Sequence, residues 1–159
     1  MKVNKELMLN TIFKNYTEII NIADMLDARI KYKAVNSYCS DPFRSCEEVA
    51  NKICELMERK NILKNLIHIV DEAIKNLPTV QQDIFDLRYK KKLKIEAIAQ
   101  VAGLSKQATF RHVQALPKTI GKELASNAFF NSFCQNGYSK IAFIANAYYR
   151  DEDRAQKVA

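Results

Sequence analysis

The sequence predicts an all-α protein in which a long antiparallel helical hairpin is followed by a helical bundle and a short helical C-terminal segment. Three observations support this fold class. The 159 residues include only three glycines and three prolines, so long stretches are free of helix-breaking residues. Apolar residues recur at steps of three and four, which is the period of an amphipathic helix. A hydrophobic content of 48% supports a packed core, in one domain or in two small ones.

The first element is predicted as one long amphipathic helix with a narrow apolar seam. Its seam residues are Leu9, Ile12, Tyr16, Ile19, Ala23, Leu26 and Ile30. The segment 37–45 interrupts the pattern, and Asp41-Pro42 within it has the composition of a turn.

A second long helix is predicted to follow, because Ser45 and Glu48 have the spacing of a capping box. Its seam residues are Val49, Ile53, Leu56, Leu63, Ile67, Val70, Ile74 and Leu77. Lys60 occupies the one polar position in that seam. Two seams joined by a short loop predict an antiparallel hairpin over residues 1–77 with coiled-coil-like packing. The hairpin could serve for dimerisation, for contact with a partner or as a spacer, or it could simply bury its own seam.

A second module is predicted over residues 78–117. Pro78 ends the hairpin because proline has no N–H to continue the helical hydrogen bonds. Thr79 is expected to cap the next helix, whose inner face is formed by Val80, Ile84 and Leu87. A basic link up to Lys94 follows that helix.

Residues 95–116, IEAIAQVAGLSKQATFRHVQAL, predict two helices joined by a tight turn. Gly103 stands where the chain must turn and where a side chain would crowd it, and Ser105 is a candidate N-cap of the second helix. The residues predicted to face inward are Ile95, Ile98, Ala99, Leu104, Ala108, Thr109, Val113 and Leu116. Those left on the outer face of the second helix are Lys106, Gln107, Phe110 and Arg111. This is the arrangement of a helix-turn-helix that reads DNA, in which the second helix lies in the major groove.

The order of motifs from Asn76 to Leu116 carries a family resemblance. Leu77-Pro78 comes first, then a helix ending in Leu-Arg-Tyr at 87–89, then Ala-x-x-x-Gly at 99–103 and Ser-x-x-x-x-Phe-Arg at 105–111. This quarter of the chain resembles region 4 of sigma-70-type RNA polymerase sigma factors, whose four-helix domain reads promoter DNA. The long helical half before it looks like the architecture of phage- or mobile-element-encoded regulators of this kind, including late-gene and autolysin regulators.

One residue departs from the family pattern. Thr109 stands where such motifs usually place Val or Ile against the core. A buried threonine hydroxyl can donate to the carbonyl one turn earlier, so the helix is still expected to fold.

Charge supports binding to DNA. The window from Ile84 to Lys122 contains nine positive and two negative side chains, and it therefore holds the whole net charge of +7. A lysine-rich solvated face would explain the charge alone, but its coincidence with the helix-turn-helix favours DNA. The residues expected to neutralise phosphates are Arg88, Lys90, Lys91, Lys92 and Lys94, with Ser105 at the helix N-terminus near another phosphate.

Base reading is expected from the outer face of the second helix. Gln107 suits the adenine edge, and Lys106 and Arg111 suit the guanine edge. Phe110 is expected either to touch a thymine methyl group or to lie against the first helix. His112 is expected either to meet the phosphate backbone or to be a half-buried or solvent-facing histidine.

The third part is predicted over residues 118–159. It comprises a helix at 118–130, a turn region at 131–140 around Asn136-Gly137, a short apolar helix or strand at 140–150, and a frayed end. Seven aromatic residues crowd into it: Phe129, Phe130, Phe133, Tyr138, Phe143, Tyr148 and Tyr149. This segment must therefore pack on the hairpin, on a second copy or on a partner.

Other function classes have little support in the sequence. Four cysteines without a CxxC motif, and two histidines that complete no zinc pattern, indicate free reduced thiols and no metal. Cys39 and Cys46 could instead pair across the loop, although no signal peptide indicates an oxidising compartment. The sequence has no phosphate-cradling glycine loop and no nucleophile motif, so neither an enzyme nor a cofactor is expected. The longest apolar stretch, 141–149, is too short to span a bilayer and contains Asn146, which favours a cytoplasmic protein.

The sequence thus predicts a sequence-specific DNA-binding transcription regulator similar to sigma region 4. Double-stranded DNA is the expected partner. Contact with RNA polymerase, and a homodimer through the hairpin or the C-terminal segment, are further expectations that follow from the resemblance and the seams. Two alternatives stay open: a small-terminase-like phage packaging oligomer, and a protein-interaction module with a degenerate sigma-like domain.

Overall fold

A computed structural model describes residues 3–36 and 45–158, and every regular element within these two ranges is helical. The all-α prediction is therefore confirmed for this part of the chain. The elements are α1 (Lys5–Lys14), α2 (Tyr16–Asn36), α3 (Cys46–Lys75), α4 (Thr79–Phe85), η1 (Asp86–Lys90), α5 (Ile95–Ala102), α6 (Lys106–Glu123), η2 (Leu124–Ser126), α7 (Ala128–Gln135), η3 (Gly137–Lys140) and α8 (Ala142–Val158). None of the helices described is both long and apolar enough to cross a membrane.

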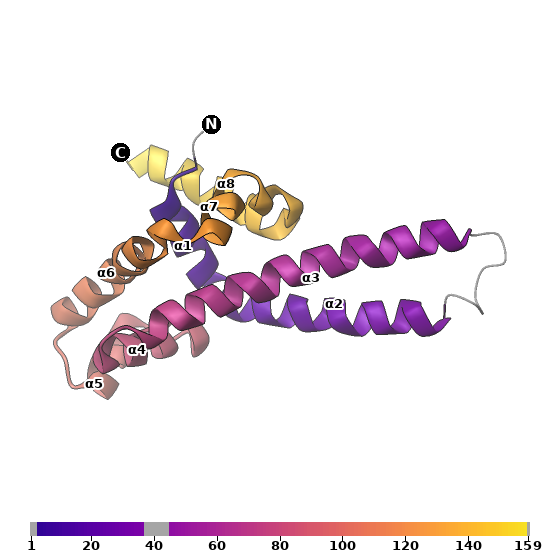
Figure 1. Ribbon diagram of the computed structural model, residues 1–159. Helices are drawn as coiled ribbons and strands as arrows, with labels where there is room; N and C mark the ends of the chain where they lie inside the picture. The colour runs from indigo at the N-terminus through magenta and orange to yellow at the C-terminus, as the bar shows by residue number, and fades with distance from the viewer. Residues whose placement is uncertain (1–2, 37–44, 159) are drawn as a thin grey trace.

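The two longest helices form an arm that projects from the rest of the molecule. Figure 1 shows α2 and α3 lying side by side and running in opposite directions, with the other helices gathered at one end. Ser45 caps α3 by accepting a hydrogen bond from the backbone N–H of Glu48 at 3.1 Å. Lys60, the polar residue of the α3 seam, lies 18% exposed and forms an ion pair with Asp27 of α2 at 3.0 Å. Asp41-Pro42 and Cys39 lie outside the described residues.

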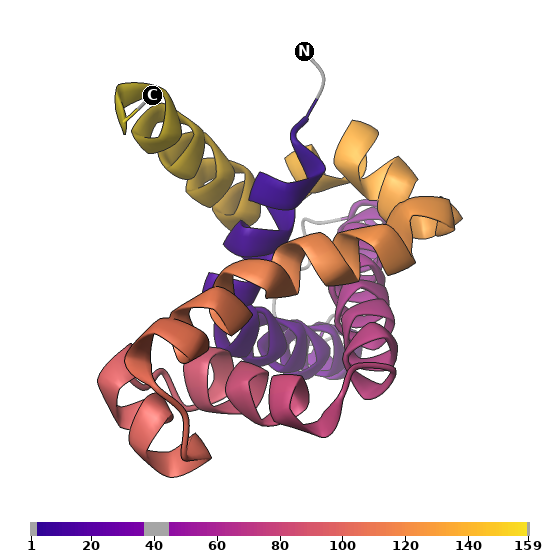
Figure 2. The ribbon, with the colours of Figure 1, turned by 90° about the vertical axis from the view of Figure 1, so that its left-hand side faces the viewer.

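The helix predicted from Leu9 to Ile30 is in fact two helices. The chain turns at Asn15, whose side-chain amide donates to the carbonyl of Thr11 at 2.8 Å and so competes with the helical hydrogen bonds. As a result α1 leaves the line of α2 and packs against α6 and α8. Figure 2 shows α6 crossing in front of α1. Leu9 and Ile12 are buried, as their place in the seam predicts, but they belong to this second packing and not to the arm.

The start of α4 also differs from the prediction. Thr79 does not cap α4, because Pro78 is its N-cap residue and no side chain satisfies the first N–H groups. Val80 is 47% exposed, whereas Ile84 and Leu87 are buried as predicted, together with Phe85. The side-chain amide of Gln82 instead donates to the carbonyl of Lys75, the last residue of α3, at 3.1 Å and to that of Leu77 at 2.7 Å.

A single hydrophobic core joins the three predicted parts. Phe85 of α4 lies at its centre, with ring centroids 5.2 Å from Phe13, 5.4 Å from Tyr16 and 5.1 Å from Tyr89. Tyr16 also donates a hydrogen bond to Asp71 of α3. Burial, together with this hydrogen bond, raises the pKa of the Tyr16 hydroxyl. The core thus holds the base of the arm firmly against the α4–α6 region.

Helix α6 is longer than predicted. The boundary expected at residue 117 falls inside it, because Pro117 is buried within a helix that continues to Glu123. The apolar face of the helix continues on both sides of the proline, through Leu116, Ile120 and Leu124, which are 0%, 0% and 4% exposed. Packing of this face outweighs the one helical hydrogen bond that proline cannot donate.

The C-terminal aromatics pack on the chain itself. Phe130, Phe133 and Tyr148 are buried in the common core, where α8 lies against α1. The expectation of a frayed end is wrong for residues 151–158, which continue α8. Asp151 ties the start of this stretch to α1 by accepting from Lys14 at 3.0 Å and from the Thr11 hydroxyl at 3.1 Å.

Candidate nucleic-acid interface

The turn between α5 and α6 depends on one glycine. Gly103 ends α5 in the left-handed conformation, with φ of 65° and ψ of 30°, and its N–H donates to the carbonyl of Ala99. A Cβ atom placed on Gly103 would meet no atom within 4 Å. The expectation that a side chain would crowd this turn is therefore wrong. Glycine is suited to the position because of its backbone angle.

The first turn of α6 is held by two local hydrogen bonds. The Ser105 hydroxyl accepts from the N–H of Ala108 at 3.1 Å, as predicted for an N-cap. Thr109 is fully buried, and its hydroxyl donates to the carbonyl of Ser105 at 3.0 Å. The predicted bond one turn back is thus confirmed, and it satisfies the polar atom that this position brings into the core.

The opposite side of α6 presents polar side chains to solvent. Gln107, Arg111, Gln114 and Lys118 are all exposed, and their spacing of four, three and four places them on one face. This stripe extends over roughly 16 Å at the helical rise of 1.5 Å per residue. Phe110 beside it is 47% exposed. His112 is half-buried.

Three of the predicted DNA-binding cations already have partners within the protein. Lys90 pairs with Asp86 at 2.9 Å, and Lys106 pairs with Glu96 at 2.5 Å. The hydrogen bond from Lys106 lowers the pKa of the Glu96 carboxyl. Arg88 is half-buried and donates from Nη1 to the carbonyl of Leu93 at 2.9 Å.

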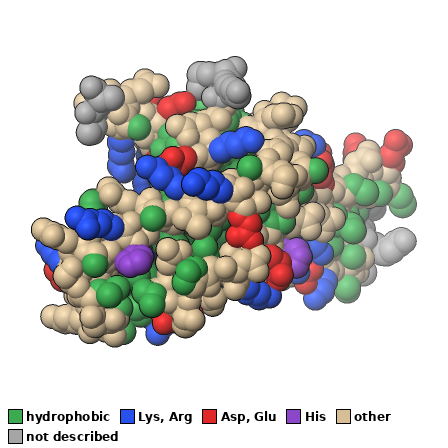
Figure 3. Space-filling view, turned by 60° about the vertical axis from the view of Figure 1, so that its left-hand side comes forward, with side chains coloured by type: hydrophobic (Ala, Val, Ile, Leu, Met, Phe, Trp, Pro, Cys, Tyr) green, Lys and Arg blue, Asp and Glu red, His purple; other side chains and the backbone are tan. Residues whose placement is uncertain are grey.

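The remaining predicted cations are exposed and have no carboxylate within ion-pair distance among the residues described. They are Lys91, Lys92, Lys94 and Arg111. Lys94 stands directly before α5, at its N-cap position. Figure 3 shows Lys and Arg side chains distributed over the face that carries α6.

The basic link has more structure than its sequence suggests. Residues 86–90 form one π-helical turn, closed by the N–H of Lys91 donating to the carbonyl of Asp86 at 2.9 Å. Lys92 then adopts a φ of 56°, which is unusual for a residue other than glycine. The N–H of Leu93 donates to the carbonyl of Leu87 at 3.0 Å and holds the link in this shape.

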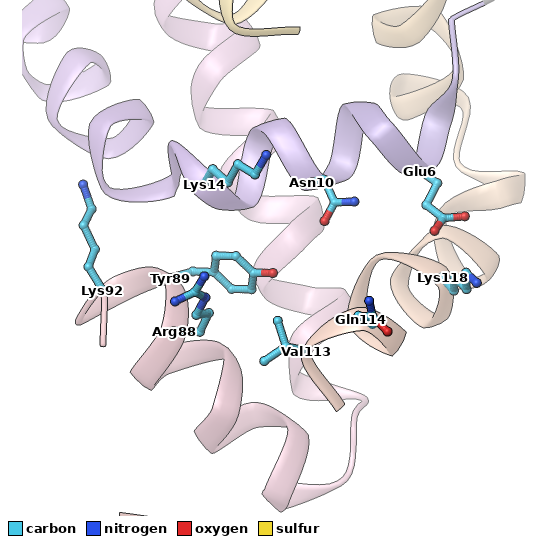
Figure 4. Close-up of a pocket in the computed structure, with 9 residues that line it drawn as sticks. All are labelled: Glu6, Asn10, Lys14, Arg88, Tyr89, Lys92, Val113, Gln114 and Lys118. Carbon is cyan, nitrogen blue, oxygen red and sulfur yellow. The ribbon is translucent and has the colours of Figure 1, made fainter. Parts of the chain in front are cut away.

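A cleft of about 530 Å³ lies between α1 on one side and η1 and α6 on the other. Figure 4 shows Glu6 and Asn10 pointing from α1 toward α6, with Arg88 and Tyr89 between the helices. The remaining residues that line the cleft are Lys14, Lys92, Val113, Gln114 and Lys118.

Sequence reasoning missed the contribution of α1 and of the second half of α6 to this region. The spacing of Gln114 and Lys118 behind Gln107 and Arg111 was a signal that could have added them to the outer face of α6. No signal in the sequence placed Asn10 or Lys14 beside this face, because that depends on the turn at Asn15.

Within the described part of the chain, no group of three or more His, Cys, Asp or Glu side chains is placed to hold a metal ion. Comparison of the chain with protein-family models, with curated proteins and with solved structures found no match.

Proposed function

We propose that this protein is a sequence-specific DNA-binding transcription regulator that reads duplex DNA with α6. The observation that carries the proposal is the polar stripe of α6. It lies on a helix whose other face is buried and whose start is set by Gly103 and Ser105. Exposed side chains on a rigid helix can enter a major groove with little loss of conformational freedom.

The base contacts would come from the first turns of α6. Gln107 can form two hydrogen bonds with adenine, and Arg111 can form two with guanine, each pair giving about 1–3 kcal/mol of discrimination. Phe110 is exposed enough to reach a thymine methyl group. Lys106 can also reach a base, because an ion pair between exposed groups is easily exchanged for a new partner.

The phosphate contacts would come from the link and the helix termini. Lys91, Lys92 and Lys94 are exposed cations before α5, and the N-terminus of α6 at Ser105 favours a further phosphate. Lys90 and Arg88 would contribute to the same positive field, although each has a partner inside the protein. Such contacts supply affinity and orientation but little sequence choice.

RNA polymerase is the second partner that the resemblance to sigma region 4 suggests, and it is part of the proposal. The proposed location is the cytoplasm. The projecting arm of α2 and α3 offers a surface for such a contact or for a second copy of the chain.

The proposal is tested by selecting genomic DNA fragments with the purified protein. The recovered site and a scrambled control are then titrated at two salt concentrations. We expect the protein to bind the recovered site at least about a thousandfold more tightly than the scrambled control. Equal binding of both, with steep salt dependence, would mean that the basic window attracts phosphate only, and it would contradict sequence-specific reading.

Two matched pairs of variants locate the reading face. Arg111→Ala and Gln107→Ala should each weaken the selected site by roughly 5- to 150-fold, which corresponds to about 1–3 kcal/mol. Arg59→Ala on α3 and Gln135→Ala on α7 remove the same exposed side chains elsewhere and should leave binding unchanged. If both reading-face variants keep full specific binding, α6 is not the reader. A protein-interaction module would keep its activity in both variants, and loss of specific DNA binding in either one would reject that alternative. A ring-sized assembly in light scattering would instead favour a packaging component.

A further inference from the structure

We propose that the cleft between α1 and α6 is a phosphate-binding site, and that the phosphate is one of the DNA backbone beside the groove that α6 reads. This inference rests on the proposed function and extends the interface to α1, which lies more than 70 residues before the helix-turn-helix in the sequence. Arg88, Lys92 and α6 belong to the interface that the sequence predicts, whereas Asn10 and Lys14 of α1 do not.

The side chains of the cleft have the chemistry that a phosphate requires. Arg88 of η1, Lys92 of the link and Lys118 of α6 are cations, and none of them has a carboxylate partner within the described residues. Figure 4 shows Arg88 within the cleft and Lys92 and Lys118 at its opposite ends. Asn10 and Gln114 add amide N–H donors from the two facing helices. Glu6 is the one acidic residue of the lining, so the cleft is positive overall. Donors that carry positive charge favour a phosphate over a neutral ligand.

The floor of the cleft is pre-organised. One N–H group of Arg88 donates to the carbonyl of Leu93. This hydrogen bond fixes the guanidinium plane and leaves the other N–H groups of Arg88 free to donate. The same carbonyl belongs to the link that holds Lys92 in its left-handed conformation. Strained backbone of this kind persists where the surroundings enforce it, and such residues cluster at binding sites. Here the strained residue is also one of the cations of the cleft.

The rim of the cleft belongs to α1. Lys14 lines the cleft while it is paired with Asp151 of α8, and its side chain is still 56% exposed. Figure 4 shows the Lys14 ammonium group on the side of α1 away from Arg88, so Lys14 adds positive charge to the rim and no direct contact inside the cleft. Because Asp151 also accepts from Thr11, the position of Lys14 depends on the docking of α8 against α1.

The cleft opens next to the reading face, which identifies the phosphate as one of DNA. Gln114 and Lys118 line the cleft and continue the stripe that begins at Gln107 and Arg111. Lys118 follows Arg111 by seven residues, a rise of about 10 Å along α6. The major groove is about 12 Å wide. The DNA strand that borders the major groove occupied by Arg111 therefore passes within reach of Lys118 and of the cleft. A free phosphorylated small molecule is the other source of the same chemistry.

The experiment measures how the affinity for the selected duplex depends on salt. Loss of one phosphate contact should reduce the slope of log affinity against log salt concentration by about 0.9. We expect this reduction for Lys118→Gln, because Lys118 lines the cleft and is not among the phosphate contacts of the link, and no change for Lys64→Gln on the exposed side of α3. The ratio between selected and scrambled sites should stay the same in both variants, because phosphates carry no sequence information.

A second pair of variants tests the contribution of α1. Asn10→Asp places a negative charge in the cleft and should weaken duplex binding severalfold, whereas Asn65→Asp places the same charge on α3 and should not. Thermal unfolding of each variant shows whether it is folded at the temperature of the titration.

Titration of the full-length protein with pyrophosphate, followed by amide chemical shifts, distinguishes the two sources of phosphate. Shifts at the cleft together with the reduced salt slopes support the inference as stated. Shifts at the cleft with unchanged slopes assign the site to a free phosphorylated molecule and overturn its role in DNA binding. Unchanged slopes without shifts overturn the site altogether, while specific binding of the selected duplex would still uphold the proposed function. Pyrophosphate binding without specific duplex binding would uphold the site and reject the proposed function.

Discussion

Gly103→Ala is expected to lower the free energy of unfolding by about 1 kcal/mol. The added methyl group meets no atom within 4 Å, so no clash contributes. The cost comes from placing a residue with a Cβ at a φ of 65°, which is about 1–2 kcal/mol. Part of this is offset because alanine reduces the freedom of the unfolded chain, by roughly 0.4–1 kcal/mol. Urea unfolding followed by circular dichroism measures the difference.

The same substitution at Gly121 is the matched control and should have the opposite sign. Gly121 lies inside α6, where alanine is about 1 kcal/mol more favourable than glycine, and its new methyl group would only touch Leu9 at 3.4 Å. The converse substitution, Lys92→Gly, should stabilise the protein by up to about 1 kcal/mol because it relieves the φ of 56°. A loss of 3 kcal/mol or more for Gly103→Ala, or an equal effect at both glycines, would refute an explanation based on backbone angle.

Two further predictions concern ionisable groups. Hydrogen bonds from Lys31 and Lys60 lower the pKa of the Asp27 carboxyl to about 2. At a pH between this value and the unfolded pKa of about 3.9, the unfolded chain therefore binds more protons than the folded protein. Stability from this group is therefore complete above pH 4 and lost as the pH falls toward 2, and Asp27→Asn should flatten the acid side of a stability profile measured in urea. Burial raises the pKa of the Cys134 thiol to about 11, so iodoacetamide at pH 8 should modify Cys46 in the native protein and Cys134 only after unfolding, as mass spectrometry would show. Equal labelling rates of the two thiols in the native protein would contradict the buried position of Cys134.

The features that were predictable from the sequence depend on residues close together in the chain. Helical segments follow from the three-and-four spacing of apolar residues, because that spacing itself defines a helix face. The N-cap hydrogen bond at Ser105 joins residues three apart, and the hydrogen bond from the Thr109 hydroxyl to the Ser105 carbonyl joins residues four apart. The left-handed turn needs only the glycine at its own position. The outer position of Gln107 and Arg111 on α6 follows in the same way from which of their neighbours are apolar.

Other features depended on which surface covers each apolar face. The apolar seam from Leu9 to Ile30 is continuous in the sequence. Its first half packs against the aromatic C-terminal segment and α6 and does not belong to the arm, and the two halves divide at Asn15. The passage of α6 through Pro117 has the same origin, since a buried apolar face on both sides of the proline compensates for one missing hydrogen bond.

The sequence by itself therefore determined that this protein is helical, where its tight turn lies and which side chains of the first turns of α6 face solvent. Only the tertiary structure decided that α1 returns beside α6, that Lys106 pairs with Glu96 of α5, and that Asn10, Arg88 and Lys118 share one cleft. The physical reason is that hydrophobic burial is not directional. A periodic pattern specifies that a face must be covered, whereas the choice among several apolar partners depends on packing between residues far apart in the chain.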